Sequence, residues 1–335
     1  MGNHSDSQET YAVDRNHTSW PQVSRFCSRV TFCFLGNSLM RQRSVKIVLM
    51  ALLWVPQSAG FSSAAEKAES KTTVGQVTAP PAALKLSAFY ARYISANGYP
   101  IVGSAKVDDY ALKEAAYLVN LMLAKRPDVR DAMVKSGSRL IVMDYQEMTT
   151  QIPEYSGLRP VDYWDRRARG LGGSRTDPVC SCAEENLLCY PGDPYSTENI
   201  LIHEFAHNIH LRGLVNVDPS FDDRLKQTYK DAMQSGLWKG KYAASNKNEY
   251  WAEGVQSWFN NNRPPDSSHN HVDTREELND YDPGLAALCD EVFGNTKFVY
   301  TRPATRLNGH MQGFVPADSP HFRWPDRLKK QAMRE

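Results

Sequence analysis

His203-Glu204-Phe205-Ala206-His207 is the stretch that decides the fold of this 335-residue chain. It has the H-E-x-x-H pattern, in which two histidines stand four residues apart and a glutamate directly follows the first. On a helix, residues i and i+4 lie on one face, so both imidazoles can direct a ring nitrogen to one ion. The glutamate is then close enough to take a proton from a water at that ion without binding the ion itself. The pattern therefore predicts a zinc site on a helix.

The residues around this motif favour a buried helix. The preceding segment, 190–199, is rich in turn-forming residues. Ser196 or Thr197 can cap the helix, and Glu198 suits the positive end of its dipole. Apolar residues then surround the motif on most sides: Ile200, Leu201, Ile202, Phe205, Ala206 and Ile209. Buried polar groups are costly unless they are paired or bind a metal, so a metal site explains the motif better than two incidental histidines on a surface helix.

A zinc site of this kind needs a third protein ligand and leaves one position for water. The metzincin arrangement is excluded, because the position six residues after His207 is Gly213. His210 falls about 60° from the face of His207, and we expect it to be partly exposed or to contact a ligand rather than the ion. A carboxylate from a later helix is therefore the expected third ligand.

Residues 248–259 have the apolar spacing of such a helix. Glu249 and Glu253 stand i, i+4 on one face of it. One can bind zinc while the other accepts a hydrogen bond from the free N–H of a ligand histidine. Spacing alone does not decide between them, and the alternative is a pair of solvated glutamates on an exposed edge.

The segment 242–253, with the sequence YAASNKNEYWAE, resembles the corresponding segment of the anthrax lethal factor catalytic domain family. That family has a tyrosine seven residues before a zinc-binding glutamate, an aromatic pair after it, and a second acidic residue four positions on; Tyr242, Glu249 and Glu253 match this spacing. The likeness covers the chain from the cap of the H-E-x-x-H helix to Phe259. Ala206 departs from it, because the family has glycine there.

The resemblance implies a gluzincin-type metallopeptidase with one zinc ion, held by His203, His207 and Glu249. It further implies that Glu204 is the general base and that Tyr242 donates a hydrogen bond to the developing oxyanion, a role for which a neutral phenol is suited. Glu253 would contact a ligand rather than the ion. The fold implied is an α+β, zincin-like domain that is mostly helical and has a small sheet.

The start of the chain predicts export. Residues 40–65 combine a basic stretch, nine apolar residues at 47–55 and a run of small residues. Nine apolar residues are too few to span a bilayer, which takes about 20, but they suit a secretory signal peptide. We interpret residues 1–39, which include Cys27 and Cys33, as an over-extended start. The predicted location is secreted or periplasmic, with no stable membrane anchor after cleavage.

Four cysteines follow the predicted signal peptide: Cys180, Cys182, Cys189 and Cys289. An even number in an exported chain favours two disulfides. The expected pairing joins one of Cys180 and Cys182 to Cys189 and the other to Cys289. The alternative is a second, cysteine-rich zinc site.

Composition excludes one class of partner. The chain has 39 basic and 38 acidic residues and a net charge of +1, which gives no electrostatic basis for binding nucleic acid. We expect a linker at 66–86, one catalytic domain at 87–315, and a polar tail at 316–335.

Local patterns predict the elements of that domain. A strand is expected at 139–145, and the stretch 146–195 is expected to be irregular and to form a functional segment or a wall of the active site. Within it, the charged run 165–169 is interpreted as a solvated border of a turn, with a substrate-facing arginine cluster as the alternative. Helices are expected at 108–123, from Pro127 to Gly137, from Asp218-Pro219 to near Gly236, after the capping box at Thr274, and from Asp282-Pro283 to Phe293.

These patterns together predict a secreted, zinc-dependent metallopeptidase that acts on a peptide or protein substrate. Two alternatives remain. One is a zinc hydrolase of a non-peptide amide or ester, and the other is an exported zinc-binding or adhesion protein without turnover.

Overall fold

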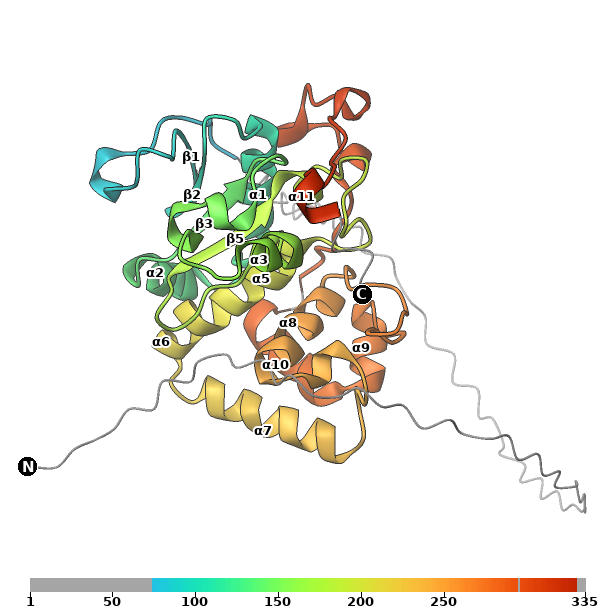
Figure 1. Ribbon diagram of the computed structural model, residues 1–335. Helices are drawn as coiled ribbons and strands as arrows, with labels where there is room; N and C mark the ends of the chain where they lie inside the picture. Colours follow the sequence, from blue (N-terminus) through green and yellow to red (C-terminus); the bar gives the residue numbers. More distant parts are fainter. Residues whose placement is uncertain (1–73, 295, 330–335) are drawn as a thin grey trace, which may run out of the picture. The chain divides into compact units, whose positions relative to one another are not determined.

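The strand predicted at 139–145 is the central strand of a five-stranded sheet (Figure 1). The computed structural model describes residues 74–294 and 296–329. Strand β3 (Arg139–Met143) lies between β2 (Tyr99–Gly103) and β5 (Val179–Ala183), both parallel to it. Strands β1 (Arg92–Ala96) and β4 (Gly170–Leu171) are the antiparallel edges, so the order is β1-β2-β3-β5-β4. The fold is mixed α/β with one small sheet, and helices make up much of the rest.

The sheet is buried on both faces. Leu140 and Val142 point to the helices and join the main core, whereas Ile141 and Met143 point to the other side and pack against Tyr155 and its neighbours. Successive residues of a strand face opposite sides, and a strand covered on both sides is apolar throughout. This explains why β3 was detectable as a continuous apolar run.

The hairpin β1–β2 was not predicted from the sequence. Its turn is Asn97-Gly98, and both residues have positive φ angles, 51° and 96°. A two-residue turn of this kind matches the twist of the strands it joins, and Asn-Gly is its preferred sequence. The signal was therefore present in the chain.

The predicted helices are confirmed with small changes at their ends. Asp108 caps α1 (Asp109–Met122), and Thr274 forms the expected capping box of α9 (Arg275–Tyr281). The other predicted helices are α2 (Pro127–Lys135), α7 (Phe221–Gln234) and α10 (Pro283–Phe293). Four short helices were not predicted: α3 (Val161–Arg167), α4 (Glu184–Leu187), α6 (Val215–Val217) and α11 (Asp326–Lys329).

The predicted linker and tail take part in the fold where the structure describes them. Val74 and Val77 pack against the main core, and Thr78 pairs with Tyr93. At the other end, Phe322 and Leu328 are buried. Residues on both sides of the expected boundaries at 87 and 315 therefore contribute apolar side chains to the packing of the described part. The predicted signal peptide and the residues before it lie outside the described residues.

The disulfide prediction is wrong, because all four cysteines of the described part are free. Cys180 and Cys182 lie on one face of β5, within the main core. Cys289 is buried in α10, and the Cys189 sulfur lies 3.8 Å from the Tyr300 oxygen. Burial raises the pKa of these thiols. A zinc ligand must be a thiolate, and no cysteine belongs to a metal-binding group in the described residues.

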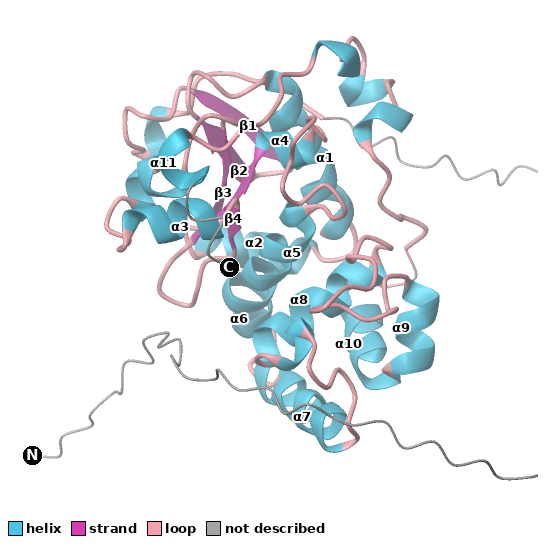
Figure 2. Cartoon of the chain, turned by 45° about the vertical axis from the view of Figure 1, so that its right-hand side comes forward, coloured by secondary structure: helices cyan, strands magenta, loops and turns pink. Residues whose placement is uncertain are grey.

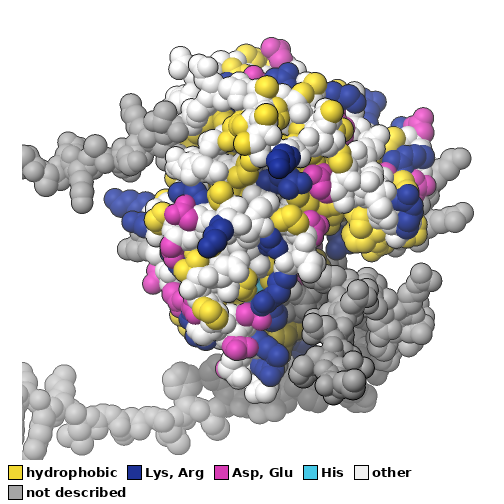
Figure 3. All heavy atoms as spheres, turned by 90° about the vertical axis from the view of Figure 1, so that its left-hand side faces the viewer, with side chains coloured by type: hydrophobic (Ala, Val, Ile, Leu, Met, Phe, Trp, Pro, Cys, Tyr) yellow, Lys and Arg dark blue, Asp and Glu magenta, His cyan; other side chains and the backbone are white. Residues whose placement is uncertain are grey.

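The surface gives no strong electrostatic field of one sign in the view of Figure 3, where basic and acidic side chains are interspersed. This agrees with the net charge of +1. In residues 74–294 and 296–329, none of the helices is both long and apolar enough to cross a membrane.

A buried carboxyl group in α4 predicts a pH dependence of stability. Glu184 accepts hydrogen bonds from the backbone N–H groups of Asp108 (2.8 Å) and Tyr145 (3.2 Å). Burial, with the nearby Asp144 carboxylate, raises its pKa from 4.5 to about 9. Between these values the folded protein holds a proton that the unfolded chain has released, so the stability due to this proton is lost as pH rises from about 4.5 to about 9.

We therefore expect the free energy of unfolding of the wild type to fall between pH 6 and 9 more steeply than that of Glu184→Gln, which has no such proton to lose. Urea denaturation at several pH values measures both slopes. The substitution lowers stability at every pH by disturbing one backbone hydrogen bond, so the slope and not the level is the test. Parallel slopes would contradict the assignment.

Candidate metal centre

Helix α5 (Ile200–Asn208) carries the H-E-x-x-H motif and packs between the sheet and a later helix, α8 (Figure 2). It begins where the Asn199 side chain accepts a hydrogen bond from the backbone N–H of Ile202, at 3.3 Å. The sequence predicted Ser196 or Thr197 as the cap. This prediction is wrong, because the structure has Asn199 there. Apolar side chains on both flanks of α5 are buried, so the polar residues of the motif are carried by a rigid element.

Beyond the motif, α5 continues as a π-helical segment, Ile209–Leu214, that contains His210. His210 is fully buried, and its Nε2 lies 2.9 Å from Oδ1 of Asp222 in α7. The expectation of a partly exposed histidine or one beside a metal ligand is wrong, because α7 covers this face and pairs the ring.

Helix α8 (Lys247–Trp258) supplies the carboxylates. Asn246 caps it, and its side chain accepts hydrogen bonds from two backbone N–H groups of the first turn. The indole N–H of Trp251 donates to the backbone carbonyl of Ala206, at 2.9 Å, which ties α8 to α5. Trp251 and Trp258 are both buried in the core. This bond fixes the rotation of α8 so that its first turn faces the motif.

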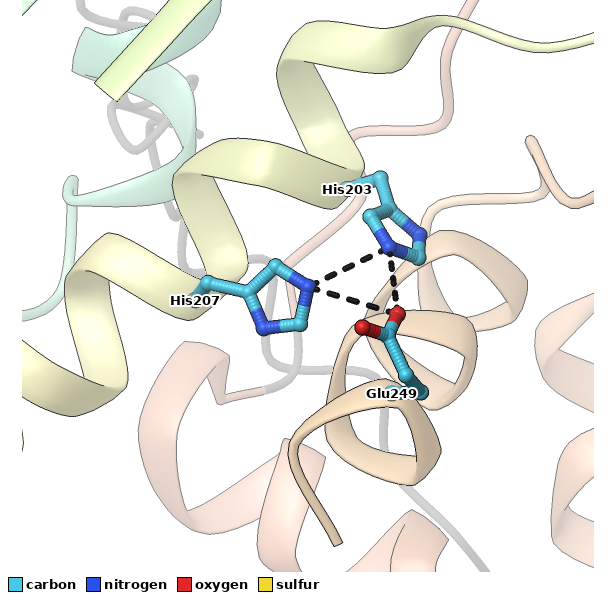
Figure 4. Close-up of side chains that lie close together, drawn as sticks. All are labelled: His203, His207 and Glu249. Atoms are coloured by element: carbon cyan, nitrogen blue, oxygen red, sulfur yellow. Dashed lines mark hydrogen bonds and ion pairs between the residues drawn. The ribbon is translucent and has the colours of Figure 1, made fainter. Parts of the chain in front are cut away.

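His203, His207 and Glu249 bring one ligand atom each to a common point (Figure 4). The Nε2 atoms of the two histidines are 3.2 Å apart, and Oε2 of Glu249 lies 3.1 Å from His203 Nε2 and 3.5 Å from His207 Nε2. Ligands that bind zinc tetrahedrally at about 2.0–2.2 Å are separated by about 3.3–3.5 Å. The spacing of the three atoms therefore fits a zinc ion, and this group is able to bind a metal.

Charge at the centre favours ligation. Burial opposes ionisation of Glu249, but His207 and His203 hold the pKa of this carboxyl well below its usual range. Burial also opposes protonation of His203, but the Glu249 carboxylate raises the pKa of this imidazole. Metal ligands must be deprotonated, so the carboxylate is ready to bind a cation and a proton leaves the imidazole when it does.

Gln256 orients His203. Its Oε1 lies 2.7 Å from His203 Nδ1, so Nδ1–H donates and the Nε2 lone pair faces the cluster. The amide N–H of Gln256 donates to Glu198 Oε2, at 2.9 Å. The sequence favours Glu253 as the acceptor for His203 Nδ1–H, but the Glu253 carboxylate is 3.7 Å from Nδ1. The sequence contained a signal for Gln256, which stands two helical turns after Glu249 and so lies on the same face.

Glu253 connects α8 to the loop that follows it. Its Oε2 accepts a hydrogen bond from Asn262 Nδ2, at 3.1 Å, and lies 3.7 Å from His269 Nε2. The carboxylate thus lies on the Nδ1 side of His203, away from the two converging Nε2 atoms. The structure brings Glu249, and not Glu253, together with both histidines.

Glu204 opens onto a cleft of about 600 Å³ that His203, Tyr242 and Glu253 also line. Burial raises the pKa of Glu204, and the charges of His203 and His207 act against this. A carboxyl group with these opposing influences can both accept and release a proton, which is what a general base must do.

Tyr242 stands on the other side of this cleft from α5. It begins a 3-10 turn, and its backbone N–H donates to the Ser268 carbonyl, at 2.8 Å. Its ring centre is 6.3 Å from that of His203. Burial and the charge of Glu249 raise the pKa of Tyr242, while the charge of Arg167 acts in the opposite direction. The phenol therefore remains a neutral hydrogen-bond donor.

The charged run 165–169 is not a solvated border. Asp165 is buried and pairs with Arg327 of α11. Arg169 is buried as well, and its Nη2 donates to Glu185 Oε2, at 3.0 Å. Arg167 is exposed and lines the cleft. The solvated interpretation is therefore wrong for the two buried residues, and the alternative of an arginine that faces the cleft fits Arg167.

The edge strand β4 runs directly along α5. A Cβ atom added to Gly170 would lie 2.9 Å from Glu204 Cγ, and one added to Gly172 would lie 2.5 Å from His207 Cβ. Such distances leave room only for glycine. Both glycines therefore set how closely the sheet edge approaches the motif.

We expect Gly172→Ala to weaken zinc binding by at least about 10-fold, the scale seen when a group that orients a ligand is lost. The added methyl would displace His207, whose position is otherwise fixed by its buried helix. Competition with a chromogenic chelator measures the affinity. Gly157→Ala is the matched control, because a Cβ there meets nothing within 4 Å. Equal zinc affinity of the two folded variants would contradict this role of Gly172.

Comparisons with known proteins add little to this description of the site. No family model matches the sequence, and no curated protein matches it. A solved structure, the PRO-PRO endopeptidase (PPEP-2) from Paenibacillus alvei, superposes with a TM-score of 0.41 and 19% identity over 58% of this chain and 97% of that chain. A likeness at this level assigns neither a fold nor an activity. The chain is therefore described by its own features, a mixed α/β fold with a His-His-Glu group able to bind a metal ion.

Proposed function

We propose that this chain is an exported, zinc-dependent metallopeptidase with a zincin-like, gluzincin-type catalytic domain. The observation that carries the proposal is the convergence of His203, His207 and Glu249 beside a cleft that Glu204 and Tyr242 line. His203, Glu204 and His207 were selected from the sequence by the H-E-x-x-H spacing, and the resemblance to the lethal factor family implies the roles of Glu249 and Tyr242.

His203, His207 and Glu249 would hold the ion, and their spacing fits it. Zinc bound there would act as a Lewis acid on a water and on a substrate carbonyl. Gln256 keeps the His203 ring in the tautomer that ligation needs. The bond from Trp251 to the backbone of α5 keeps the two ligand-bearing helices in register.

Glu204 performs the proton transfers in this proposal. Its carboxylate takes a proton from the attacking water while the water oxygen bonds to the carbonyl carbon of the substrate. It then gives the proton to the leaving amine nitrogen as the C–N bond breaks. One water is thereby added across the peptide bond, and Glu204 returns to its starting state.

Tyr242 stabilises the negative charge that forms on the carbonyl oxygen. Its phenol is neutral, and a neutral donor held in place is effective because it does not have to reorganise during the reaction. Arg167 lines the same cleft, and its charge opposes the rise in the pKa of this phenol, which makes the phenolic proton easier to donate.

Two alternatives from the sequence use the same centre. A hydrolase of a non-peptide amide or ester would need the same groups. A zinc-binding or adhesion protein without turnover would need neither Glu204 nor Tyr242. Structural zinc sites are also closed by four protein ligands, whereas the group found in the described residues has three.

Turnover of an unbiased peptide library by the purified, zinc-loaded protein tests the proposal, with a panel of small amides and esters in parallel. We expect cleavage of peptides, loss of cleavage after removal of the metal by a chelator, and recovery when zinc is added back. Turnover of the small amides or esters alone would identify the non-peptide hydrolase. Stoichiometric zinc with no turnover of any substrate would identify the binding protein.

The proposed export is tested separately. Expression in a host with a secretory pathway, followed by mass spectrometry of the protein outside the cytoplasm, is expected to give a new N-terminus near residue 65. A protein that keeps residues 40–65 and stays in the cytoplasm would contradict the signal peptide.

A further inference from the structure

Arg167 is a cleft arginine without a carboxylate partner among residues 74–294 and 296–329. It ends α3 and lines the cleft, and its side chain is exposed. No ion pair joins it to a carboxylate in the part of the chain that the structure describes, whereas two other arginines of the cleft have carboxylate partners. Arg263 lies 3.4 Å from Glu198, and Arg169 is paired with Glu185. A guanidinium that is left free beside a reaction site is available to a ligand.

The position of Arg167 relative to the reacting groups is well defined. It lines the same cleft as Tyr242, Glu204 and His203, and its charge acts on Glu204. Its backbone carbonyl accepts a hydrogen bond from the Tyr195 hydroxyl, at 2.9 Å, which fixes the end of α3. A substrate group that reaches Arg167 therefore lies close to the bond that Glu204 and Tyr242 act on.

The chemistry of the cleft favours a single negative charge. A guanidinium binds a carboxylate through two parallel hydrogen bonds. A phosphate dianion would need more donors, and the carboxylates of Glu198 and Glu253 in the same cleft would repel it. Arg166, the other cleft arginine without a carboxylate partner, lies over the Trp324 ring at 4.4 Å. One guanidinium without a carboxylate partner in the described residues thus matches one carboxylate.

We propose that the cleft selects peptides that carry a carboxylate next to the scissile bond, and that Arg167 binds it. This inference rests on the proposed peptidase function and names the substrate class. The carboxylate can belong to an acidic side chain or to a free C-terminus, since both present the same group to the guanidinium.

Matched peptide pairs test the inference. One arm compares Glu with Gln at each position within three residues of the cleaved bond, and the other compares a free C-terminal acid with its amide. In the wild type we expect kcat/KM to favour the carboxylate in at least one arm by about 10- to 100-fold, the range for a charge-assisted pair. Arg167→Ala should bring this ratio close to one, and Arg167→Lys should retain part of it.

The ratio separates recognition from catalysis. Loss of the influence of the Arg167 charge on Tyr242 slows the reaction of every substrate alike and leaves the ratio unchanged. Arg166→Ala is the matched control, because it removes an equal charge from the same cleft. We expect it to change the ratio by less than about fivefold, as for a screened surface charge. Zinc content confirms that each variant keeps its centre.

Three results would overturn the inference. One is a wild type that cleaves both members of every pair equally well. Another is an equal fall of the ratio in Arg166→Ala and Arg167→Ala. The third concerns Glu204→Gln, which should bind the carboxylate peptide more tightly in fluorescence polarisation; equal binding of both members would exclude the carboxylate site. If the wild type cleaves no peptide, the proposed function fails, and the same binding experiment still decides whether the carboxylate site exists.

Discussion

Glu204→Gln is expected to lose turnover almost completely and to keep its zinc. Glutamine has the shape of glutamate but cannot take a proton from the attacking water. Positioned general acid–base groups contribute about 10²- to 10⁴-fold to rates, so we expect kcat to fall by at least about 10²-fold. Initial rates on a cleaved peptide, together with zinc analysis of the same preparation, measure both quantities.

The zinc measurement is essential to this result, because Glu204 stands next to a proposed ligand. Equal zinc content and an equal thermal midpoint would show that the substitution acts on the reaction and not on the centre. A variant that is as active as the wild type would remove Glu204 from the role of base, whatever its position in the cleft.

Glu249→Ala should purify without zinc, whereas Glu253→Ala should keep some metal. Glu249 Oε2 lies within 3.5 Å of both converging Nε2 atoms, so its loss removes one of three ligands. Glu253 lies at the other ring nitrogen of His203, where Gln256 already makes a shorter contact. Loss of a group that supports a ligand costs about 10- to 100-fold in affinity or activity. We expect the effect of Glu253→Ala to lie at the lower end of this range, because Gln256 still orients His203.

Metal content after dialysis and affinity by chelator competition distinguish the two variants. Each substitution removes one carboxylate from the same face of α8, so each serves as the control for the other. The reverse outcome, with zinc kept by Glu249→Ala and lost by Glu253→Ala, would move the ligand by one helical turn. It would also show that the two helices pack differently from the structure.

The helices could be predicted because their signals are local. Asp108, Thr274 and Asp282 each accept hydrogen bonds from backbone N–H groups of the first turn of a helix, and such caps are visible in a sequence. Strand β5 was missed for a different reason. Its two cysteines suggested disulfides, so a short run that is buried by pairing with β3 was placed in an irregular segment. Burial of this kind depends on partners that are distant in the chain.

The candidate site also has residues that could be predicted from local spacing and residues that could not. Spacing within α5 and α8 selected His203, His207 and two candidate glutamates, because a helix determines which residues share a face. The choice of Glu249 by position depends on how α8 rotates against α5, which the bond from Trp251 fixes. Arg167 could not be assigned from the sequence, because its place beside Tyr242 in the lining of the cleft depends on how two distant segments meet.

The ion pairs between α3 and α11 have a consequence for the stage of synthesis at which the cleft can form. Arg327 forms ion pairs with Asp162 and Asp165, and the guanidinium of Arg166 lies over the Trp324 ring. Residues 324–327 therefore support α3, which forms part of the wall of the cleft. The ribosome adds these residues some 75 positions after Glu249, the last proposed ligand. A nascent chain would thus contain all three proposed zinc ligands before the residues that support the wall of the cleft have been added. Under the proposed function, the ability to cleave a substrate would therefore arise only late in synthesis.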